Sequence, residues 1–156
     1  MQTTEKLVAV LNNLIEINND RIAGYEKASE ETKTHDTDLQ GLFLSMANDS
    51  KNYARELTQE VIKSGGEFST ETTNKGKVYR VWMDVKATFA GNDRQAILDS
   101  CEYGEDEAQK AYTDALSSDA EMSAQVRTII AEQQASLKTA HDLIKKYRNF
   151  NKAVEA

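Results

Sequence analysis

The segment DSCEYGEDEAQKAY, residues 99–112, holds the densest group of chemically active side chains in the sequence. Within two helical turns it places four acidic residues beside Cys101: Glu102, Glu105, Asp106 and Glu107. Carboxylates three or four residues apart share one face of a helix, and they could bind a divalent metal if other helices supplied further oxygen or imidazole ligands. The remaining segments decide whether such partners exist.

Other reactive side chains are few. Cys101 is the only cysteine, so no intramolecular disulfide can form, and its acidic neighbours disfavour a thiolate. We expect it to be a small buried hydrophobe rather than a nucleophile. His35 in a polar link and His141 beside Asp142 are expected at the surface. Glu105 leans toward the apolar face of its helix, Glu102 lies at the boundary, and Asp106 and Glu107 are expected in solvent.

Long helices must position these groups, because the chain lacks proline and its apolar residues recur at helical spacing. The first helix should run from about Thr4 to Glu31. A capping-box pattern at Thr37 and Gln40 begins the second, which ends at SGG, 64–66. Asp93 should cap the third long helix, which breaks at SSD, 117–119, and the last carries apolar residues from Met122 to Tyr147. A shorter helix lies between the second and third, with inward-facing Val78, Val81, Trp82, Val85 and Phe89.

Connection lengths set the expected topology. Short links join the first two long helices and the last two, so each of these pairs is antiparallel. Residues 64–93 provide enough chain to return along the bundle, so the two middle helices can be parallel. We therefore predict an all-α fold, a ferritin-like up-down-down-up four-helix bundle with a short extra helix in the long crossover. Residues 1–156 form a single domain in this prediction.

Polar residues interrupt each apolar stripe near mid-helix, at a common level. Diiron bundles place a glutamate on each of two helices and Glu-x-x-His on each of the other two. Here those positions hold one carboxylate and no histidine, and amides and hydroxyls are weak ligands for a redox-active metal. We expect instead a hydrogen-bonded polar layer that fixes helix register. Its expected members are Asn18, Ser50, Tyr53, Glu105, Gln133 and Ser136.

Several sequence blocks occur together: LNNLIEINND, GYEKASEE, LFLSMANDSKNYARELTQEV, RVWMDVKATFAG, CEYGEDEAQKAY and AHD. In this combination the chain resembles a bacterial family of ferritin-like four-helix-bundle proteins of unknown function, from about Leu11 to His141. The resemblance implies the ferritin-like fold. It implies no activity, substrate or cofactor, and it assigns no role to the CE-x-GED block at Cys101, Glu102, Gly104, Glu105 and Asp106.

Composition excludes several function classes. A net charge of −7 with scattered basic residues disfavours nucleic acid and anionic membrane surfaces as partners. The first residues lack the basic and apolar regions of a signal peptide, and no apolar run could span a bilayer, so we expect a cytoplasmic protein. Phosphate-binding loops, nucleophile elbows, CxxC and HExxH are absent from the sequence.

These observations favour a non-catalytic bundle that acts through protein association, as a homo-oligomer or with a protein partner, and without a cofactor. The alternative is a metal-binding or metal-storing bundle that holds iron, manganese or zinc at a non-standard carboxylate site around Glu102 and Glu105. A third hypothesis is a small-molecule site within the polar layer.

Overall fold

The computed structural model describes residues 2–32, 37–73 and 94–155. These residues form four α-helices and no strand, which confirms the all-α prediction. The helices are α1 (Gln2–Thr32), α2 (Thr37–Lys63), α4 (Arg94–Ser117) and α5 (Ala124–Glu155). The expected short helix, with its anchors Trp82 and Phe89, lies outside the described residues, as do His35 and Asp93.

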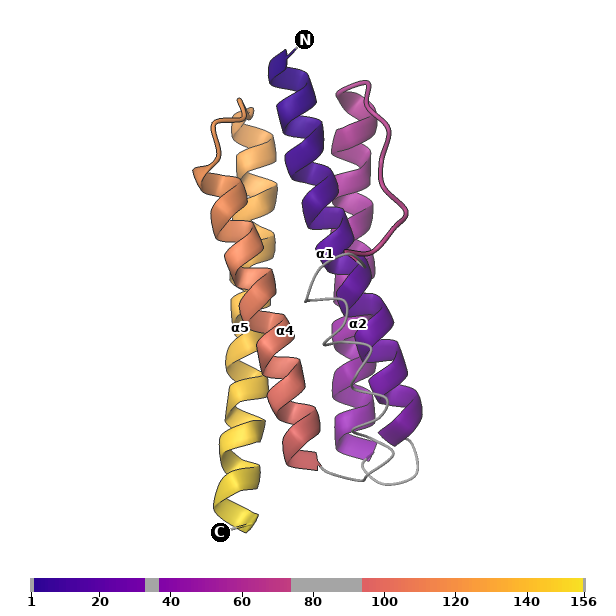
Figure 1. The fold of residues 1–156 in the computed structure, drawn as a ribbon, viewed down its shortest axis with the longest axis vertical. Helices are drawn as coiled ribbons and strands as arrows, with labels where there is room; N and C mark the ends of the chain where they lie inside the picture. Colours follow the sequence, from indigo (N-terminus) through magenta and orange to yellow (C-terminus); the bar gives the residue numbers. More distant parts are fainter. Residues whose placement is uncertain (1, 33–36, 74–93, 156) are drawn as a thin grey trace.

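The four helices lie side by side along one long axis (Figure 1). α1 runs from the N-terminal end of the molecule to the opposite end, and α2 returns antiparallel to it. α4 runs in the same direction as α2, and α5 returns beside α4. The most extensive packing joins α1 to α2 and α4 to α5. The two middle helices are thus parallel.

The end of α2 follows directly from its glycines. Gly65 has a φ of 80°, a left-handed conformation that costs glycine little. Its N–H donates to the carbonyl of Ile62 at 2.9 Å, and the N–H of Gly66 donates to the carbonyl of Val61 at 3.1 Å. This pair of bonds is a Schellman motif, which satisfies carbonyl groups of the last helical turn. The predicted stop at residues 64–66 is confirmed.

The start of α5 is set by Ser123. Its side-chain Oγ accepts from the N–H of Val126 at 3.1 Å, and its carbonyl accepts from the N–H of Arg127 at 3.0 Å. Both bonds identify Ser123 as the N-cap residue. Met122, which we expected on the helix, therefore lies just before it.

Buried positions follow spacings of three, four or seven residues along the helices. On α5 they are Val126, Ile130, Gln133, Leu137 and Ile144. On α1 the same pattern includes Leu11, Leu14, Asn18, Arg21, Tyr25 and Ala28. Helices that pack nearly parallel interlock their side chains at this spacing. Polar residues thus occupy the same seam as the apolar core.

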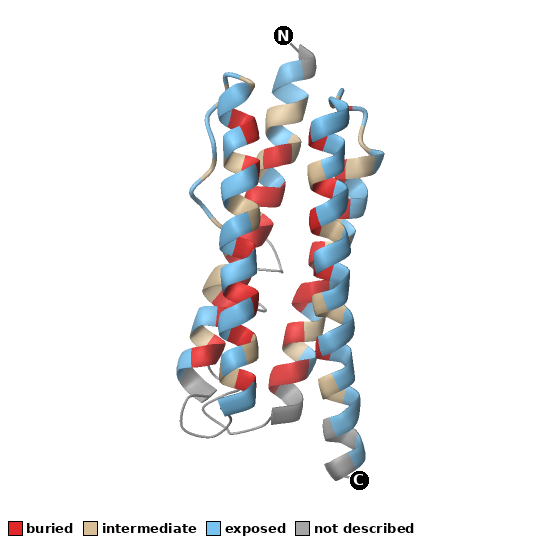
Figure 2. Ribbon diagram, turned by 180° about the vertical axis from the view of Figure 1, so that it is seen from behind, coloured by how far each residue is buried: buried red, intermediate tan, exposed pale blue. Residues whose placement is uncertain are grey.

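Buried positions run along the length of the helices (Figure 2), and the apolar ones form two separate clusters. One cluster, near the C-terminal end of α1, includes Tyr25, Phe43, Leu98 and Ile144. The other, near the N-terminal end of α1, includes Leu11, Leu57, Tyr112 and Ile130. Positions on each helix between these clusters carry the polar side chains that make up the candidate site.

After α2, residues 64–73 run back beside α1 (Figure 1). Asn12 on α1 donates to the carbonyl of Glu67 and accepts from the N–H of Ser69, both at 2.9 Å. Further along, Asp20 accepts from the N–H of Thr73 at 2.9 Å. Polar side chains on one face of α1 therefore hold this extended segment along the helix.

Candidate functional site

A buried ion pair crosses the middle of the bundle. The side chains of Arg21 on α1 and Glu105 on α4 are 1% and 0% exposed. Nε and Nη2 of Arg21 each lie 2.7 Å from Oε1 of Glu105. Loss of hydration offsets much of the attraction between two buried charges, so the surrounding hydrogen bonds decide whether such a pair is tolerated.

Two hydroxyl groups complete the surroundings of the pair. Nη1 of Arg21 donates to Oγ of Ser50 on α2, and the hydroxyl of Tyr25 donates to Oε1 of Glu105 at 2.9 Å. The guanidinium carbon also lies 5.3 Å from the centre of the Tyr25 ring, within the range of a cation–π interaction. The ion pair therefore joins α1, α2 and α4.

The buried charges shift the pKa values of neighbouring groups. Desolvation lowers the pKa of Arg21, but its neighbours, chiefly the Glu105 carboxylate, raise it more, so the net shift is upward. Burial raises the pKa of the Cys101 thiol, and Glu105 raises it further. The same two causes raise the pKa of Tyr25. At neutral pH the guanidinium is charged and the thiol is protonated, so Cys101 is a buried apolar group rather than a nucleophile.

A chain of hydrogen bonds continues the polar layer toward α5 and α2. Nδ2 of Asn18 donates to the hydroxyl of Tyr112 at 2.8 Å, and this hydroxyl donates to Oε1 of Gln133 at 2.7 Å. Nε2 of Gln133 then donates to the carbonyl of Tyr53 at 3.2 Å and to Oε1 of Glu56 at 3.1 Å. Together with the ion pair, this chain connects all four described helices.

Four of the six residues expected in the polar layer are buried: Asn18, Ser50, Glu105 and Gln133. Tyr53 is half-buried, and its side chain hydrogen-bonds Ser136, which is exposed. The core seam of α5 passes through Gln133 and Leu137, so residue 136 lies off it. Sequence reasoning missed three buried members of the network, Arg21, Tyr25 and Tyr112, and the exposed Glu56. The spacing of α1 contained the signal, because Arg21 follows Asn18 by three residues and precedes Tyr25 by four.

The donor set in this layer does not fit a diiron centre. Its single buried carboxylate, that of Glu105, already faces a guanidinium, and a dication placed beside that fixed positive charge would be repelled. The other members offer amide and hydroxyl groups, and none of the described residues here is a histidine. Two buried acceptor atoms, Oε2 of Glu105 and Oδ1 of Asn18, have no hydrogen-bond partner in the described part of the chain.

Comparison with known proteins identifies a family. A family model described as "Domain of unknown function (DUF2383)" matches residues 6–118. The chain belongs to this family. The match includes Arg21 and Glu105 and ends one residue after α4, short of the His141 limit expected from sequence resemblance. None of the curated proteins matches the chain.

A second charged cluster lies on the seam between α4 and α5, and its α5 members fall outside the family match. Arg148 Nη1 pairs with Oε2 of Glu102, whose side chain is 14% exposed. Nε2 of His141 lies 2.5 Å from Oδ1 of Asp106, and its Nδ1 lies 3.3 Å from Oδ1 of Asp142. Glu102 and Glu105, the pair considered for a metal, thus have different partners: Arg148 for one and Arg21 for the other.

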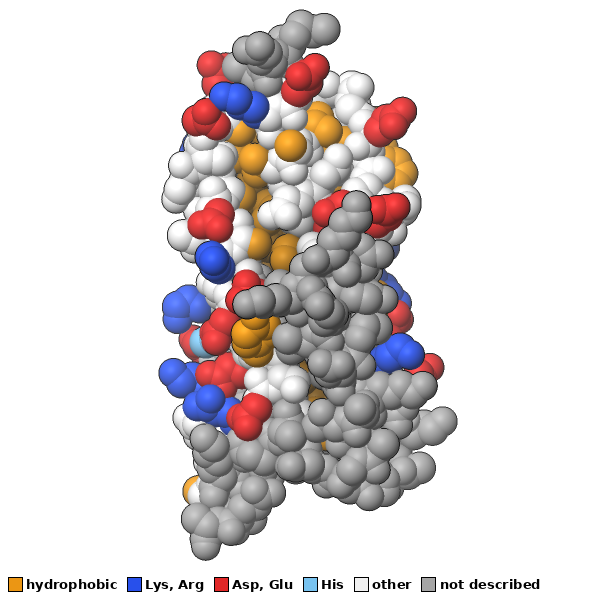
Figure 3. Space-filling view, in the orientation of Figure 1, with side chains coloured by type: hydrophobic (Ala, Val, Ile, Leu, Met, Phe, Trp, Pro, Cys, Tyr) orange, Lys and Arg blue, Asp and Glu red, His pale blue; other side chains and the backbone are white. Residues whose placement is uncertain are grey.

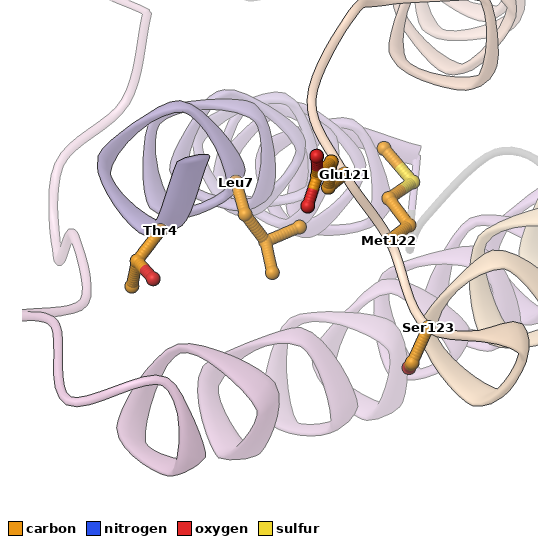
Figure 4. A pocket seen from close by; sticks show the side chains of 5 residues that line it. All are labelled: Thr4, Leu7, Glu121, Met122 and Ser123. Carbon is orange, nitrogen blue, oxygen red and sulfur yellow. The ribbon is translucent and has the colours of Figure 1, made fainter. Parts of the chain in front are cut away.

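The N-terminal end of α1 borders two depressions. One, of about 330 Å³, is lined by residues of α1 and of the link before α5: Thr4, Leu7, Glu121, Met122 and Ser123 (Figure 4). The other, of about 410 Å³, lies between α1 and residues 64–66. Ligand sites need several polar groups that converge on one point. Each described lining contains one charged side chain, so the polar layer and the α4/α5 cluster are the better candidate sites.

None of the helices in the described ranges has both the length and the apolar character required to cross a bilayer.

Proposed function

We propose that this chain is a single-domain, ferritin-like four-helix bundle that is non-catalytic and acts through protein association. The observation that carries the proposal is the buried Arg21–Glu105 pair, which lies at the level where such a bundle would bind its metal. The directions of the helices support the ferritin-like topology, since α2 and α4 are parallel and a long connection separates them. A guanidinium then supplies the positive charge that a metal would supply.

The ion pair supports a structural role for the layer. Buried polar groups that bond only to one another can specify a single helix register, because a shifted register would leave a charge unpaired. Here the guanidinium contacts α2 and α4 at once, through Ser50 and Glu105. Because the polar layer has this structural role, we infer that the function depends on the surface of the bundle.

The C-terminal part of α5 offers a surface for association. Leu143 and Phe150 are 37% and 69% exposed, and with Lys146 and Tyr147 they line a depression of about 370 Å³. The spacing of these residues places them on one stripe of the helix. Aromatic side chains such as Tyr147 and Phe150 are enriched in protein interfaces.

Charge favours a second copy of this chain as the occupant. At the stripe itself the exposed charged side chains are Lys145 and Lys146, although the whole chain carries −7. An acidic surface on one copy and a basic, apolar stripe on another are complementary, and such contacts favour encounter.

Sedimentation velocity over a range of concentrations tests the association. We expect concentration-dependent self-association that Phe150→Ser weakens. Leu44→Ser is the matched control, because Leu44 is a 50% exposed apolar residue on a different helix, α2, and should leave association unchanged. A wild-type chain that stays monomeric at every concentration, or a Phe150→Ser variant that associates normally, would contradict the proposal.

Metal analysis tests the assignment of the core. Protein purified without chelators, and then incubated with Fe(II), should contain no metal that depends on Glu105. Stoichiometric iron, manganese or zinc that Glu105→Gln removes from a folded chain would refute the non-metal core. If substitution of His141 removed the metal instead, the metal would be bound by the charged cluster between α4 and α5, and the assignment of a metal-free core would stand.

A further inference from the structure

The seam between α4 and α5 brings three side chains together that share metal-ligating chemistry. Glu102 and Asp106, four residues apart on α4, lie on one face of the helix, and His141 reaches them from α5. One ligand atom from each residue, a ring nitrogen from the histidine and a carboxylate oxygen from each acid, lies within 4.8 Å of the other two. We propose that these three residues form a site for a zinc-class divalent cation.

The histidine is held as a metal ligand would be. In protein metal sites the second ring nitrogen of a ligating histidine usually donates to a carboxylate, which fixes the tautomer and turns the other nitrogen toward the metal. Here Nδ1 of His141 lies 3.3 Å from Oδ1 of Asp142, while Nε2 faces Asp106. A neutral His141 with its proton on Nδ1 would direct the lone pair of Nε2 toward the cluster.

The glutamate is also held in place. Glu102 is paired with Arg148, and the two side chains are 14% and 23% exposed. A carboxylate has two oxygens and can therefore accept from an arginine while it binds a cation, an arrangement in which the outer partner orients the ligand. The cluster thus contains three ligands, and supporting side chains orient two of them: Asp142 orients His141, and Arg148 orients Glu102.

Charge and exposure also suit a small cation. Three carboxylates, from Glu102, Asp106 and Asp142, face two fixed positive charges, from Arg148 and from Lys138, which pairs with Asp142. With a neutral histidine the local sum is −1. Asp106 is 60% exposed, so solvent can supply a fourth ligand. Figure 3 shows a histidine between acidic and basic side chains on this side of the molecule.

The chemical types of the ligand atoms indicate which metal the site would prefer. One imidazole with two carboxylates matches zinc and neighbouring transition metals, whereas magnesium and calcium prefer oxygen ligands alone. The site is separate from the Arg21–Glu105 pair and does not rest on the association proposed for α5. Glu102, which the alternative hypothesis from the sequence joined with Glu105 at a metal site, has His141 and Asp106 as its partners in this proposal.

Calorimetric titration of Zn²⁺ into the chelator-treated full chain tests the site. We expect one ion per chain with a dissociation constant below about 100 µM. Co²⁺ should give visible absorption bands, and zinc should shift the Nε2 resonance of His141 in an NMR spectrum of the imidazole nitrogens. His141→Gln should weaken binding at least tenfold, and Asp106→Asn and Asp142→Asn should each weaken it by about tenfold or more.

Two variants serve as controls. His35→Gln removes the only other histidine, and Glu107→Gln removes an acid of α4 outside the cluster, so both should bind as the wild type does. Circular dichroism should show that every variant remains folded without metal. Absence of binding at about 100 µM, or binding that His141→Gln leaves unchanged, would overturn the site. Loss of binding in a folded Glu105→Gln variant would overturn it as well, because the ion would then lie in the core.

Discussion

Glu102 and Glu105 are three residues apart on α4, and each pairs with an arginine from another helix, yet their surroundings differ. The inner pair, Arg21 with Glu105, is almost fully buried, with side chains 1% and 0% exposed. The outer pair, Arg148 with Glu102, lies on the α4/α5 seam at 23% and 14%. A three-residue step turns a helix by about 300°, enough to move a side chain from the core to its edge.

The difference in burial sets what each pair contributes. Removal of one partner from a buried pair strands a charge in a medium of low polarity, which costs about 3–5 kcal/mol. Water and salt screen a partly exposed pair, so its contribution is usually below about 1 kcal/mol. An arginine–glutamate pair is therefore essential to the stability of the core at one position, whereas at the other it contributes little to the stability of the fold.

The largest effect should follow from Arg21→Met. This variant leaves Glu105 buried without its cation, and we expect the free energy of unfolding in urea to fall by about 3–5 kcal/mol. The double variant Arg21→Met/Glu105→Leu removes both charges and should recover most of that loss. A single variant within about 1 kcal/mol of wild type would show that the inner pair behaves like a surface pair.

Tyr25→Phe should have the next largest effect. It removes the hydroxyl that donates to Oε1 of Glu105, and a hydrogen bond to a charged group contributes about 1.5–3 kcal/mol. The loss should also raise the rate at which a thiol reagent labels Cys101, which is buried in the native chain. Tyr103→Phe provides the control, since Tyr103 is 37% exposed on the same helix as Glu105 and should change neither measurement.

Arg148→Met should lower the unfolding free energy by only about 0.2–1 kcal/mol, since the outer pair remains partly hydrated. The difference from wild type should shrink further in 1 M salt, where the screening length falls to about 3 Å. The loss caused by Arg21→Met should persist in the same salt. If salt reduced both losses equally, burial would not distinguish the two pairs.

The smallest effect concerns pH, in protein kept metal-free with a chelator. Desolvation lowers the pKa of His141, but hydrogen bonds to Asp142 and Asp106 raise it more, so the folded-state pKa lies above the ordinary 6.5. Protonated His141 therefore stabilises the fold below pH 6.5, and this contribution is lost as pH rises through the folded-state pKa. Unfolding curves should be compared below pH 6.5 and above the folded-state pKa of His141. His141→Gln should remove the difference in unfolding free energy between them, which we expect to be roughly 0.5 kcal/mol. A variant with the same pH profile as wild type would assign the dependence to other groups.

Much of the fold could be predicted because its signals are local. Helical spacing placed α1 within two residues of its observed ends, and Thr37 and the glycines after Lys63 marked the limits of α2. The polar interruptions at Asn18 and Gln133 also followed from spacing alone. Capping and amphipathic pattern act within a few residues of each position, so they can be read along the chain.

Arg21 was missed because helical spacing is read from apolar residues, and its neighbour Ile22 offers an apolar side chain for the core at the same turn. The structure instead follows the alternating spacing through Leu14, Asn18, Arg21 and Tyr25, and Ile22 is only half-buried. An arginine enters a core only if a partner compensates its charge, and that partner, Glu105, lies 84 residues away in sequence. The spacing of α1 places residue 21 on the buried seam, but α1 alone does not reveal the partner that allows an arginine to be buried there.

The sequence by itself determined the all-α class, the ends of α1 and α2 and the presence of polar groups at the middle of the bundle, since these depend on spacing and on local hydrogen bonds. Only the tertiary structure decided which charges meet. It placed Arg21 on Glu105 and His141 on Asp106, because pairing depends on how four helices are turned and shifted relative to one another. A rotation of α4 by one residue, about 100°, would bring the exposed Asp106 to the position of the buried Glu105.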